Sequence, residues 1–236
     1  MKLVFDIETI GDDWGEMDEK TKESLTRWAK RESPSEEIFN AKKQDIIEGL
    51  GFSPLTGEIV ALGVLDVEKE KGAVYFQAPD QGLRESEEDG VKLKPMDEKE
   101  ILSSFWEVAS KYNEFISFNG RVFDVPFIMV RSAIHGIKPT KNLMANRYTN
   151  YQSNTALHID LLDQLTFYGA VRRKGNLHLW CRAFGIKSPK EGEITGDEVS
   201  RAFKDKRYEE IAKYNVDDLR ATRELYRYWE EFIRFS

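Results

Sequence analysis

Cysteine and histidine are scarce in this chain. Its 236 residues include one cysteine, Cys181, and three histidines, at positions 135, 158 and 178. A single thiol excludes an internal disulfide and a zinc site built on several thiolates. Three scattered histidines also argue against a histidine-rich metal site. If the chain binds a metal, its carboxylates are therefore the expected ligands.

Long apolar runs are missing as well. No stretch approaches the roughly 20 residues that a membrane-spanning helix needs, so we expect no membrane association. The first ten residues, MKLVFDIETI, place two acids where a signal peptide requires an unbroken apolar segment. We therefore expect a cytoplasmic protein rather than a secreted one.

The composition is typical of a globular protein. Hydrophobic residues make up 40% of the chain, aromatic residues 12% and charged residues 33%, which excludes disordered, collagenous and fibrous classes. The length suits one core with insertions, and the sequence contains no internal repeat. We therefore predict a single domain over residues 1–236.

Positive charge is concentrated in one part of an otherwise acidic chain. The sequence has 35 basic and 42 acidic residues, a net charge of −7. Residues 138–190, however, contain nine basic residues and only two acids, Asp160 and Asp163. Such a band could hold a polyanion, because Lys and Arg neutralise phosphates and release counterions. A solubilising surface with chance clustering explains the same pattern equally well.

The order of the expected elements favours a mixed α/β fold. Apolar runs predict strands at residues 2–6, 58–67, 73–77 and 114–118. Helical spacing of apolar residues predicts helices within 16–48, interrupted at Ser33-Pro34, and at 97–112, 124–135, 158–165, 176–185 and 208–235. Residues 80–95 are predicted to form a polar loop. This order suits a mixed sheet flanked by helices better than a bundle or a sandwich.

Two acids, Asp6 and Glu8, come at the end of the first predicted strand. Residues i and i+2 of an extended chain point to the same side, so both carboxylates face the same way. Neighbouring carboxylates repel each other unless a cation lies between them or one is protonated. Chance produces such pairs in an acidic chain, and Asp66 and Glu68 form a second one. Only the first pair lies where an apolar strand leaves the core, the edge at which open α/β sheets bind ligands.

Three further residues are candidates because of their position. Asp124 follows the strand predicted at 114–118 after a short loop, and by itself it is better explained as a helix cap. Tyr214 and Asp218 lie four residues apart in the C-terminal helix and share one face, whereas Asp217 should point away. Both residues also have a purely structural explanation. Tyr214 could be a tyrosine at the edge of the core, and Asp218 could be a surface acid paired with an arginine.

Taken in order, these motifs resemble those of a nuclease superfamily. FDIET (Phe5–Thr9), FNGRVFD (Phe118–Asp124) and YNVDD (Tyr214–Asp218) resemble the three exonuclease motifs of the DEDD (DnaQ-like) superfamily. A tyrosine in the third motif marks the DEDDy branch, which includes the proofreading domains of family-B DNA polymerases. The sister branch has a histidine where this chain has Lys213.

Two connecting segments extend the resemblance to nearly the whole chain. GFSPLTGEIVALGV and GIKSPKEGEITGDEV are similar to segments of stand-alone exonucleases related to the polymerase-B domain. The resemblance implies a ribonuclease H-like fold, with a mixed five-stranded sheet and helices on both faces. The fifth strand is not evident, although residues 158–165 could be a strand running into a helix. Asp160 would then be a supporting or substrate residue, but a helix cap fits it better. Residues of about 11–56 match no functional element and are treated as an insertion.

The resemblance also implies a 3′→5′ exonuclease that releases 5′-mononucleotides by a two-metal-ion mechanism. The ligands of the two divalent cations, Mg²⁺ or Mn²⁺, would be the carboxylates of Asp6, Glu8, Asp124 and Asp218. Tyr214 would position the attacking water, since a phenol with an ordinary pKa near 10 is a poor base. The residues implied to bind the terminal nucleotide are Thr9, Ile10, Asn119 and Phe123. For Phe123, a place in the core is an equal alternative.

The expected substrate is the 3′ end of single-stranded DNA, and two alternatives stay open. An exoribonuclease or a short-oligonucleotide hydrolase fits the same motifs, because no residue has been found that accepts or excludes a 2′-hydroxyl. A non-catalytic nucleic-acid-binding module on the same fold is the other alternative, and four mutually repelling carboxylates argue against it. The sequence identifies no protein partner.

Overall fold

A mixed β-sheet forms the centre of the protein, whose computed structural model describes residues 1–187 and 196–235. Its strands within these residues are β1 (Lys2–Gly11), β2 (Gly57–Asp66), β3 (Gly72–Phe76), β4 (Ser86–Glu88), β5 (Val91–Pro95), β6 (Glu114–Ser117) and β7 (Leu157–Asp160). Their spatial order is β4-β5-β3-β2-β1-β6-β7. β1 runs antiparallel to β2 and parallel to β6, so the sheet contains both kinds of pairing.

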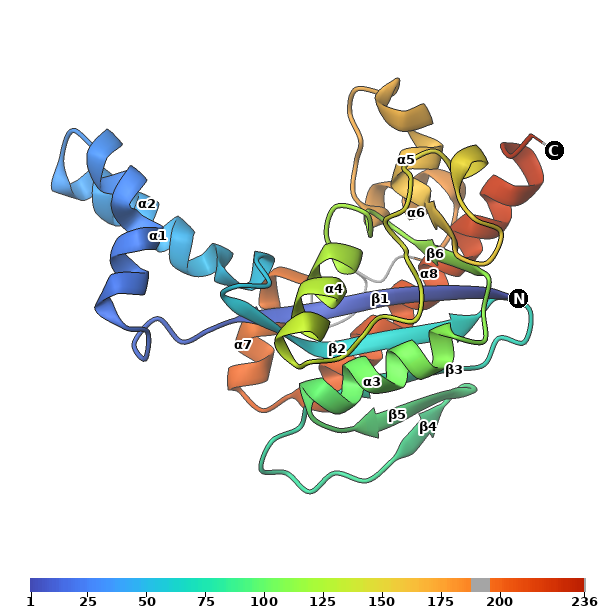
Figure 1. The fold of residues 1–236 in the computed structure, drawn as a ribbon, viewed down its shortest axis with the longest axis horizontal. Coiled ribbons are helices and arrows are strands. Elements are labelled where there is room, and N and C mark those ends of the chain that lie inside the picture. The colour runs from blue at the N-terminus through green and yellow to red at the C-terminus, as the bar shows by residue number, and fades with distance from the viewer. Residues whose placement is uncertain (188–195, 236) are drawn as a thin grey trace.

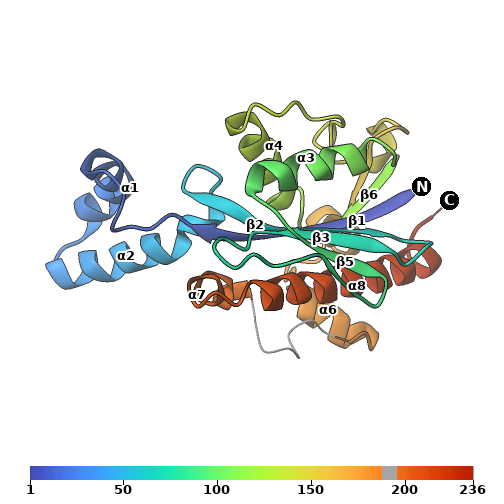
Figure 2. The same cartoon turned by 90° about the horizontal axis from the view of Figure 1, so that it is seen from below.

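Helices cover both faces of this sheet. The α-helices are α1 (Glu19–Glu32), α2 (Glu36–Glu48), α3 (Glu98–Ala109), α4 (Asp124–Ile134), α5 (Leu161–Leu165), α6 (Leu177–Phe184), α7 (Val199–Lys204) and α8 (Tyr208–Phe232). Figure 1 shows α8 running along the back of the sheet, and Figure 2 shows α3 and α4 on the opposite face from α6, α7 and α8. None of the described helices is both long and apolar enough to span a membrane.

Each face of the sheet has its own apolar core. Phe5 belongs to the core beneath α3 and α4, whereas Val4 belongs to the core beneath α8. Successive side chains of a strand point to opposite faces, which explains why neighbours in β1 serve different cores. Asp6 and Glu8 alternate in phase with Val4. The strand therefore directs both acids toward α8.

Most of the expected elements are confirmed. β2 is the middle strand of the sheet, in agreement with its continuous apolar run. The break predicted at Ser33-Pro34 separates α1 from α2. Asp97 begins α3 in a capping box, in which its side chain accepts from the backbone of Glu100 and the Glu100 side chain accepts in return. Residues 157–165 form β7 followed by α5, so the strand-into-helix alternative is correct.

The loop predicted at residues 80–95 is correct only as far as residue 85, and the predicted five-stranded sheet is wrong. This segment contains β4 and β5, which raise the number of strands in the described sheet to seven. β5 pairs with β3 in parallel and buries Val91 and Leu93, while Lys92 points to solvent. This alternation of apolar and charged residues has the period of a strand. The surrounding polar residues obscured it in the sequence.

The first strand is longer than predicted. β1 continues beyond Asp6 to Gly11, because its second half also pairs with β2. The pairing shifts register between Glu8 and Thr9, as at a β-bulge. The two acids therefore lie inside the strand rather than at its end.

The insertion forms a helical hairpin that projects from the sheet (Figure 1). It consists of α1, α2 and the 3₁₀ turn η1 (Gly49–Phe52). Its base is tied to β1, since the Thr9 hydroxyl donates to the carbonyl of Gly51 at 2.7 Å, and a bond from the amide of Asp12 to the carbonyl of Thr56, at 2.8 Å, joins the two ends of the insertion. No residue of α2 is buried. The hairpin thus enlarges the surface beside β1 without adding to the sheet core.

α8 crosses β2 at Gly63, where no larger residue fits. A Cβ at this position would lie 2.0 Å from Oδ1 of Asn215 and 2.5 Å from Cδ1 of Leu219. Gly63 pairs with Asp6 in the ladder between β1 and β2. The glycine therefore admits the part of α8 that approaches the acids of β1.

Replacing Gly63 by Ala should lower the free energy of unfolding by about 1–3 kcal/mol, because the added methyl group forces α8 away from the sheet. Urea denaturation followed by circular dichroism measures the loss. Gly49→Ala is the matched control, since a Cβ there meets only the Phe52 ring, at 3.9 Å, and the backbone is right-handed. Equal stability of the two variants would contradict the close-packing explanation.

Candidate active site

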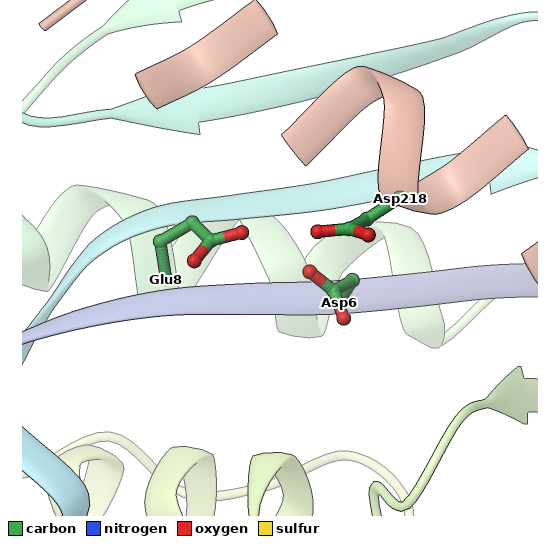
Figure 3. A group of neighbouring side chains, drawn as sticks. All are labelled: Asp6, Glu8 and Asp218. Atoms are coloured by element: carbon green, nitrogen blue, oxygen red, sulfur yellow. The ribbon is translucent and has the colours of Figure 1, made fainter. Parts of the chain in front are cut away.

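Three carboxylates from opposite ends of the chain meet between β1 and α8 (Figure 3). Asp6 and Glu8 project from alternate positions of β1, and Asp218 projects toward them from α8. One carboxylate oxygen of each residue lies within 4.8 Å of those of the other two. Glu8 and Asp218 are buried, and Asp6 is partly buried. This set of hard oxygen donors fits a divalent cation such as Mg²⁺ or Mn²⁺.

Asp124 approaches the same group from the first turn of α4. The ladder between β1 and β6 ends at Val4, so the amide of Ile7 lies beyond it. This amide donates to Oδ1 of Asp124 at 3.2 Å. The helix-cap explanation of Asp124 is therefore wrong, because Phe123 occupies the cap position and the Asp124 side chain turns to β1 instead.

Burial and mutual repulsion raise the pKa values of these acids. Burial is the largest cause for Asp6, Glu8 and Asp124, and it raises the pKa of each. The neighbouring carboxylate of Asp218 raises all three further. For Asp124 the pKa reaches about 7. Without a cation, the group therefore retains protons near neutral pH.

Asn215 lies among the acids and was not identified from the sequence. Its Nδ2 donates to Asp6 at 2.8 Å and to Glu8 at 3.5 Å, and this bond lowers the pKa of Glu8. The side chain is completely buried, and its Oδ1 accepts no hydrogen bond from the described residues. The amide thus holds the two carboxylates of β1 in place from α8. Only its position beside Tyr214 in the YNVDD motif could have indicated this role.

Tyr214 and Asp218 share a face of α8, in agreement with their spacing. Burial first, and then the charges of Asp218, Glu8 and Asp6, raise the pKa of Tyr214, which also forms a hydrogen bond with Asp218. The phenol is therefore protonated at neutral pH and can act as a donor. Asp217 points elsewhere, into a separate cavity that Arg220 also lines.

The loop between β6 and α4 is shaped by Asp160. The amides of Asn119 and Arg121 donate to its two carboxylate oxygens at 2.9 and 3.0 Å. Asp160 also caps α5 by accepting from the amide of Leu162 at 3.0 Å, so the predicted cap is confirmed. Asn119 adopts a left-handed φ of +63°, which asparagine tolerates better than most residues. One carboxylate therefore links β7 to the loop that leads into Asp124.

Three of the four residues expected to contact a terminal nucleotide, Thr9, Ile10 and Asn119, lie in different surroundings. The Thr9 hydroxyl is occupied by its bond to Gly51, so this residue fixes η1 against β1. Ile10 is partly buried and packs against the core beneath α8. Asn119 is partly buried in the loop held by Asp160. All of them are close in sequence to the four acids, but only part of each side chain reaches the surface.

Phe123 is partly buried, so it packs against the core without being enclosed in it, and its contact with a nucleotide stays a prediction. Its ring packs against Phe127 at 5.6 Å between centroids. It also meets the edge of Phe52, a residue of η1, at 6.3 Å. Phe52 is 69% exposed. Phe52 was not singled out from the sequence, although it lies in the segment GFSPLTGEIVALGV.

A family model matches residues 75–232, which is more than half of the chain. The family is described as a predicted 3′-5′ exonuclease related to the exonuclease domain of PolB. The matched segment contains Asp124, Tyr214 and Asp218, whereas Asp6 and Glu8 precede it.

Individual relatives are DNA polymerases. The chain is 24% identical over 161 residues to the DNA polymerase of Autographa californica nuclear polyhedrosis virus, covering 61% of this chain and 16% of the viral protein. It is 25% identical over 180 residues to DNA polymerase 1 of Sulfolobus acidocaldarius, covering 71% of this chain and 20% of that polymerase. The chain thus spans a fifth or less of the length of these relatives.

A solved structure shares the fold. The family B DNA polymerase from the hyperthermophilic archaeon Pyrobaculum calidifontis matches with a TM-score of 0.56 and 18% sequence identity. The match covers 97% of this chain and 24% of the polymerase chain. Together with the mixed sheet and its two helical layers, it supports the ribonuclease H-like α/β class that the motifs implied.

Binding of a divalent cation to this site should release protons, because the cation favours the ionised form of carboxylates whose pKa values are raised. Asp124, with a pKa of about 7, is mostly protonated at pH 6 and mostly ionised at pH 8.5. Proton release should therefore be larger at pH 6, and Mg²⁺ affinity should be higher at pH 8.5. Calorimetry in two buffers of different ionisation enthalpy measures both. Equal proton release at the two pH values would contradict the raised pKa.

Proposed function

The chain belongs to the family of predicted 3′-5′ exonucleases related to the exonuclease domain of PolB, and on that premise we propose that it is a metal-dependent 3′→5′ exonuclease acting on single-stranded DNA. The observation that carries the proposal is the meeting of Asp6, Glu8 and Asp218 within 4.8 Å, with Asp124 beside them. Three separate parts of the chain bring charges together that repel one another. A bound cation would offset this repulsion, whereas folding alone gives no reason to bring the four carboxylates together.

The four carboxylates would hold two divalent cations, Mg²⁺ or Mn²⁺. When bound, such ions activate a water and stabilise the leaving 3′-oxygen of a terminal phosphodiester, so that a 5′-mononucleotide is released. The protein itself holds the four carboxylates close together before any cation binds. The Asn215 amide and the backbone of Ile7 do this by donating to carboxylates on either side of β1.

Tyr214 would position the attacking water by a hydrogen bond. Its raised pKa excludes it as a general base at neutral pH, since it remains protonated there. Its neighbour Asp218 fixes the phenol by accepting its hydrogen bond. The tyrosine is thus a positioning residue rather than a proton acceptor.

The terminal nucleotide would lie against the surface between β1 and the loop before α4. Ile10, Asn119 and Phe123 would contact it, and Thr9 would act indirectly by holding η1 in place. The exposed ring of Phe52 extends the aromatic surface of Phe123 toward solvent. Aromatic surfaces accept any base by stacking, which suits an enzyme that removes nucleotides one after another.

The central test compares Asp218→Asn with Asp217→Asn, neighbouring acids of α8 that point to different places. Loss of a metal ligand removes several kcal/mol of transition-state stabilisation, so Asp218→Asn should lower kcat about 10³-fold. Asp217→Asn should retain activity within about twofold of the unmodified protein. The assay follows shortening of 5′-labelled single-stranded DNA and RNA of one sequence with Mg²⁺, Mn²⁺ or EDTA.

The substrates and controls in this assay separate the alternatives. A ladder that shortens from the 3′ end faster on DNA supports the proposal, whereas faster shortening of RNA would favour an exoribonuclease. Tight binding of both strands without metal-dependent cleavage would contradict the enzyme and favour a non-catalytic module.

Tyr214→Phe should lower kcat about 10- to 100-fold and change KM by less than about threefold, because the hydroxyl is needed in the transition state rather than for binding. Steady-state kinetics on a single-stranded 15-mer measures both parameters. Tyr228→Phe, a partly exposed tyrosine elsewhere on α8, is the control and should behave as the unmodified protein. An unchanged kcat for Tyr214→Phe would remove the water-positioning role.

A further inference from the structure

Within the basic stretch found in the sequence, no exposed residue carries a negative charge. Between residues 138 and 187 the only acids are Asp160 and Asp163, and both are buried. Asp160 accepts hydrogen bonds from the loop before α4, and Asp163 accepts two from the guanidinium of Arg147. The exposed charged residues of this segment are all positive: Lys138, Arg147, Arg172, Arg173, Lys174, Arg182 and Lys187. Lys190 and most of the segment GIKSPKEGEITGDEV lie outside the described residues.

Aromatic rings lie at the surface within the same segment. Tyr148 is 50% exposed and Phe167 56% exposed. The rings of Tyr148 and Tyr168 are 4.7 Å apart between centroids. The guanidinium of Arg147 lies over the Tyr168 ring at 5.9 Å, within the range of a cation–π contact. Arginine and tyrosine planes are thus assembled at one place on the surface.

The backbone displays these rings at an energetic cost. Phe167 and Tyr168, in the 3₁₀ turn η3 (Phe167–Gly169), have φ values of +50° and +57°. Bulky residues rarely adopt this left-handed conformation, and it persists only where the surrounding structure imposes it. Thr166 holds the turn in this conformation. Its amide and hydroxyl both donate to the carbonyl of Leu162, and its carbonyl accepts from the amide of Val171. A turn of this kind keeps Phe167 out of the core.

This surface is connected to the loop that leads into the acidic group. Arg121, three residues before Asp124, donates from its guanidinium to the carbonyl of Leu143 at 3.3 Å. The same guanidinium lies within electrostatic range of Arg147 and Tyr168. The loop before α4 is thereby joined to the segment that carries the exposed rings.

We propose that these residues form a binding surface for the single-stranded DNA upstream of the 3′ end. Bases stack on Tyr148, Phe167 and Tyr168, and phosphates bind the basic residues that follow η3, Arg172, Arg173 and Lys174. Exposed ring faces select a single strand, because a duplex hides its base faces in its own stack. The proposal rests on the proposed function for the placement of the 3′ end. It makes the substrate a strand of many nucleotides rather than a di- or trinucleotide.

Binding is tested without catalysis. Anisotropy of a 5′-fluorescein thymidine 15-mer, measured in EDTA, should show a Kd raised about 10-fold by Phe167→Ala, in line with the loss of one stacked base. Phe167→Trp, which keeps a ring, should restore binding to within about twofold. Replacing Arg172, Arg173 and Lys174 together by Ser should reduce the slope of log affinity against log salt by about 2, since each phosphate contact to a single strand contributes about 0.7.

Two controls guard against general effects. Phe235→Ala removes a ring that is 93% exposed at the far end of the chain, and it should leave the Kd unchanged. Lys30→Ser with Arg31→Ser removes exposed charge from the hairpin, and it should leave the salt slope unchanged. Thermal melts of every variant confirm that it is folded.

Activity distinguishes this proposal from the proposed function. The unmodified protein should cleave the 15-mer with a kcat/KM at least about 10-fold higher than a thymidine trimer, and Phe167→Ala should abolish most of this difference while cleaving the trimer normally. Equal cleavage of trimer and 15-mer, or unchanged binding by Phe167→Ala and the triple variant, would overturn the proposed surface. Ring-dependent binding without any metal-dependent cleavage would instead support the surface and contradict the exonuclease.

Discussion

Mutual repulsion among buried carboxylates is the constraint on which the arrangement of this protein depends. Four acids near one another, away from water, oppose folding unless protons, cations or hydrogen-bond donors compensate them. The protein supplies donors on two sides, the Asn215 amide from α8 and the Ile7 amide from β1 itself. Gly63 allows the Asn215 amide to reach the acids, because only a residue without a side chain lets α8 come so close to β2. Protons retained on Asp124 and its neighbours compensate the rest of the charge.

The topology explains why distant residues meet. β1, from the start of the chain, lies inside the sheet between β2 and β6, and α8, from its end, packs against β1 and β2 on one face (Figure 2). β6 pairs in parallel with β1 and stops early, so that the following loop delivers Asp124 to the freed edge of β1. Asp160 at the end of β7 then fixes that loop. β6 and β7, which follow β1 on one side of the sheet, therefore both help to place Asp124.

Local patterns predicted the elements whose stability is local. The apolar run of β2, the helix predicted from Asp97 and the break at Ser33-Pro34 each depend on residues close in sequence, and all three are confirmed. β5 was missed because its short alternation of apolar residues and lysines lies among polar residues, and its pairing with β3 is not visible in the sequence. The length of β1 was underestimated for the same reason, since β2 extends it past the acids.

The sequence by itself determined which acids are present, that Asp6 and Glu8 share one side of a strand, and that Tyr214 and Asp218 share one side of a helix. These facts follow from the periods of strand and helix alone. Only the tertiary structure decided that Asp124 binds β1 rather than capping its own helix, and that Asn215 lies between two carboxylates. It also decided that the two acids of the basic stretch, Asp160 and Asp163, are buried, so that its exposed charges are all positive. Long-range contacts of this kind depend on how the elements pack, because residues that form a hydrogen bond or bury one another can be separated by any number of residues in the sequence.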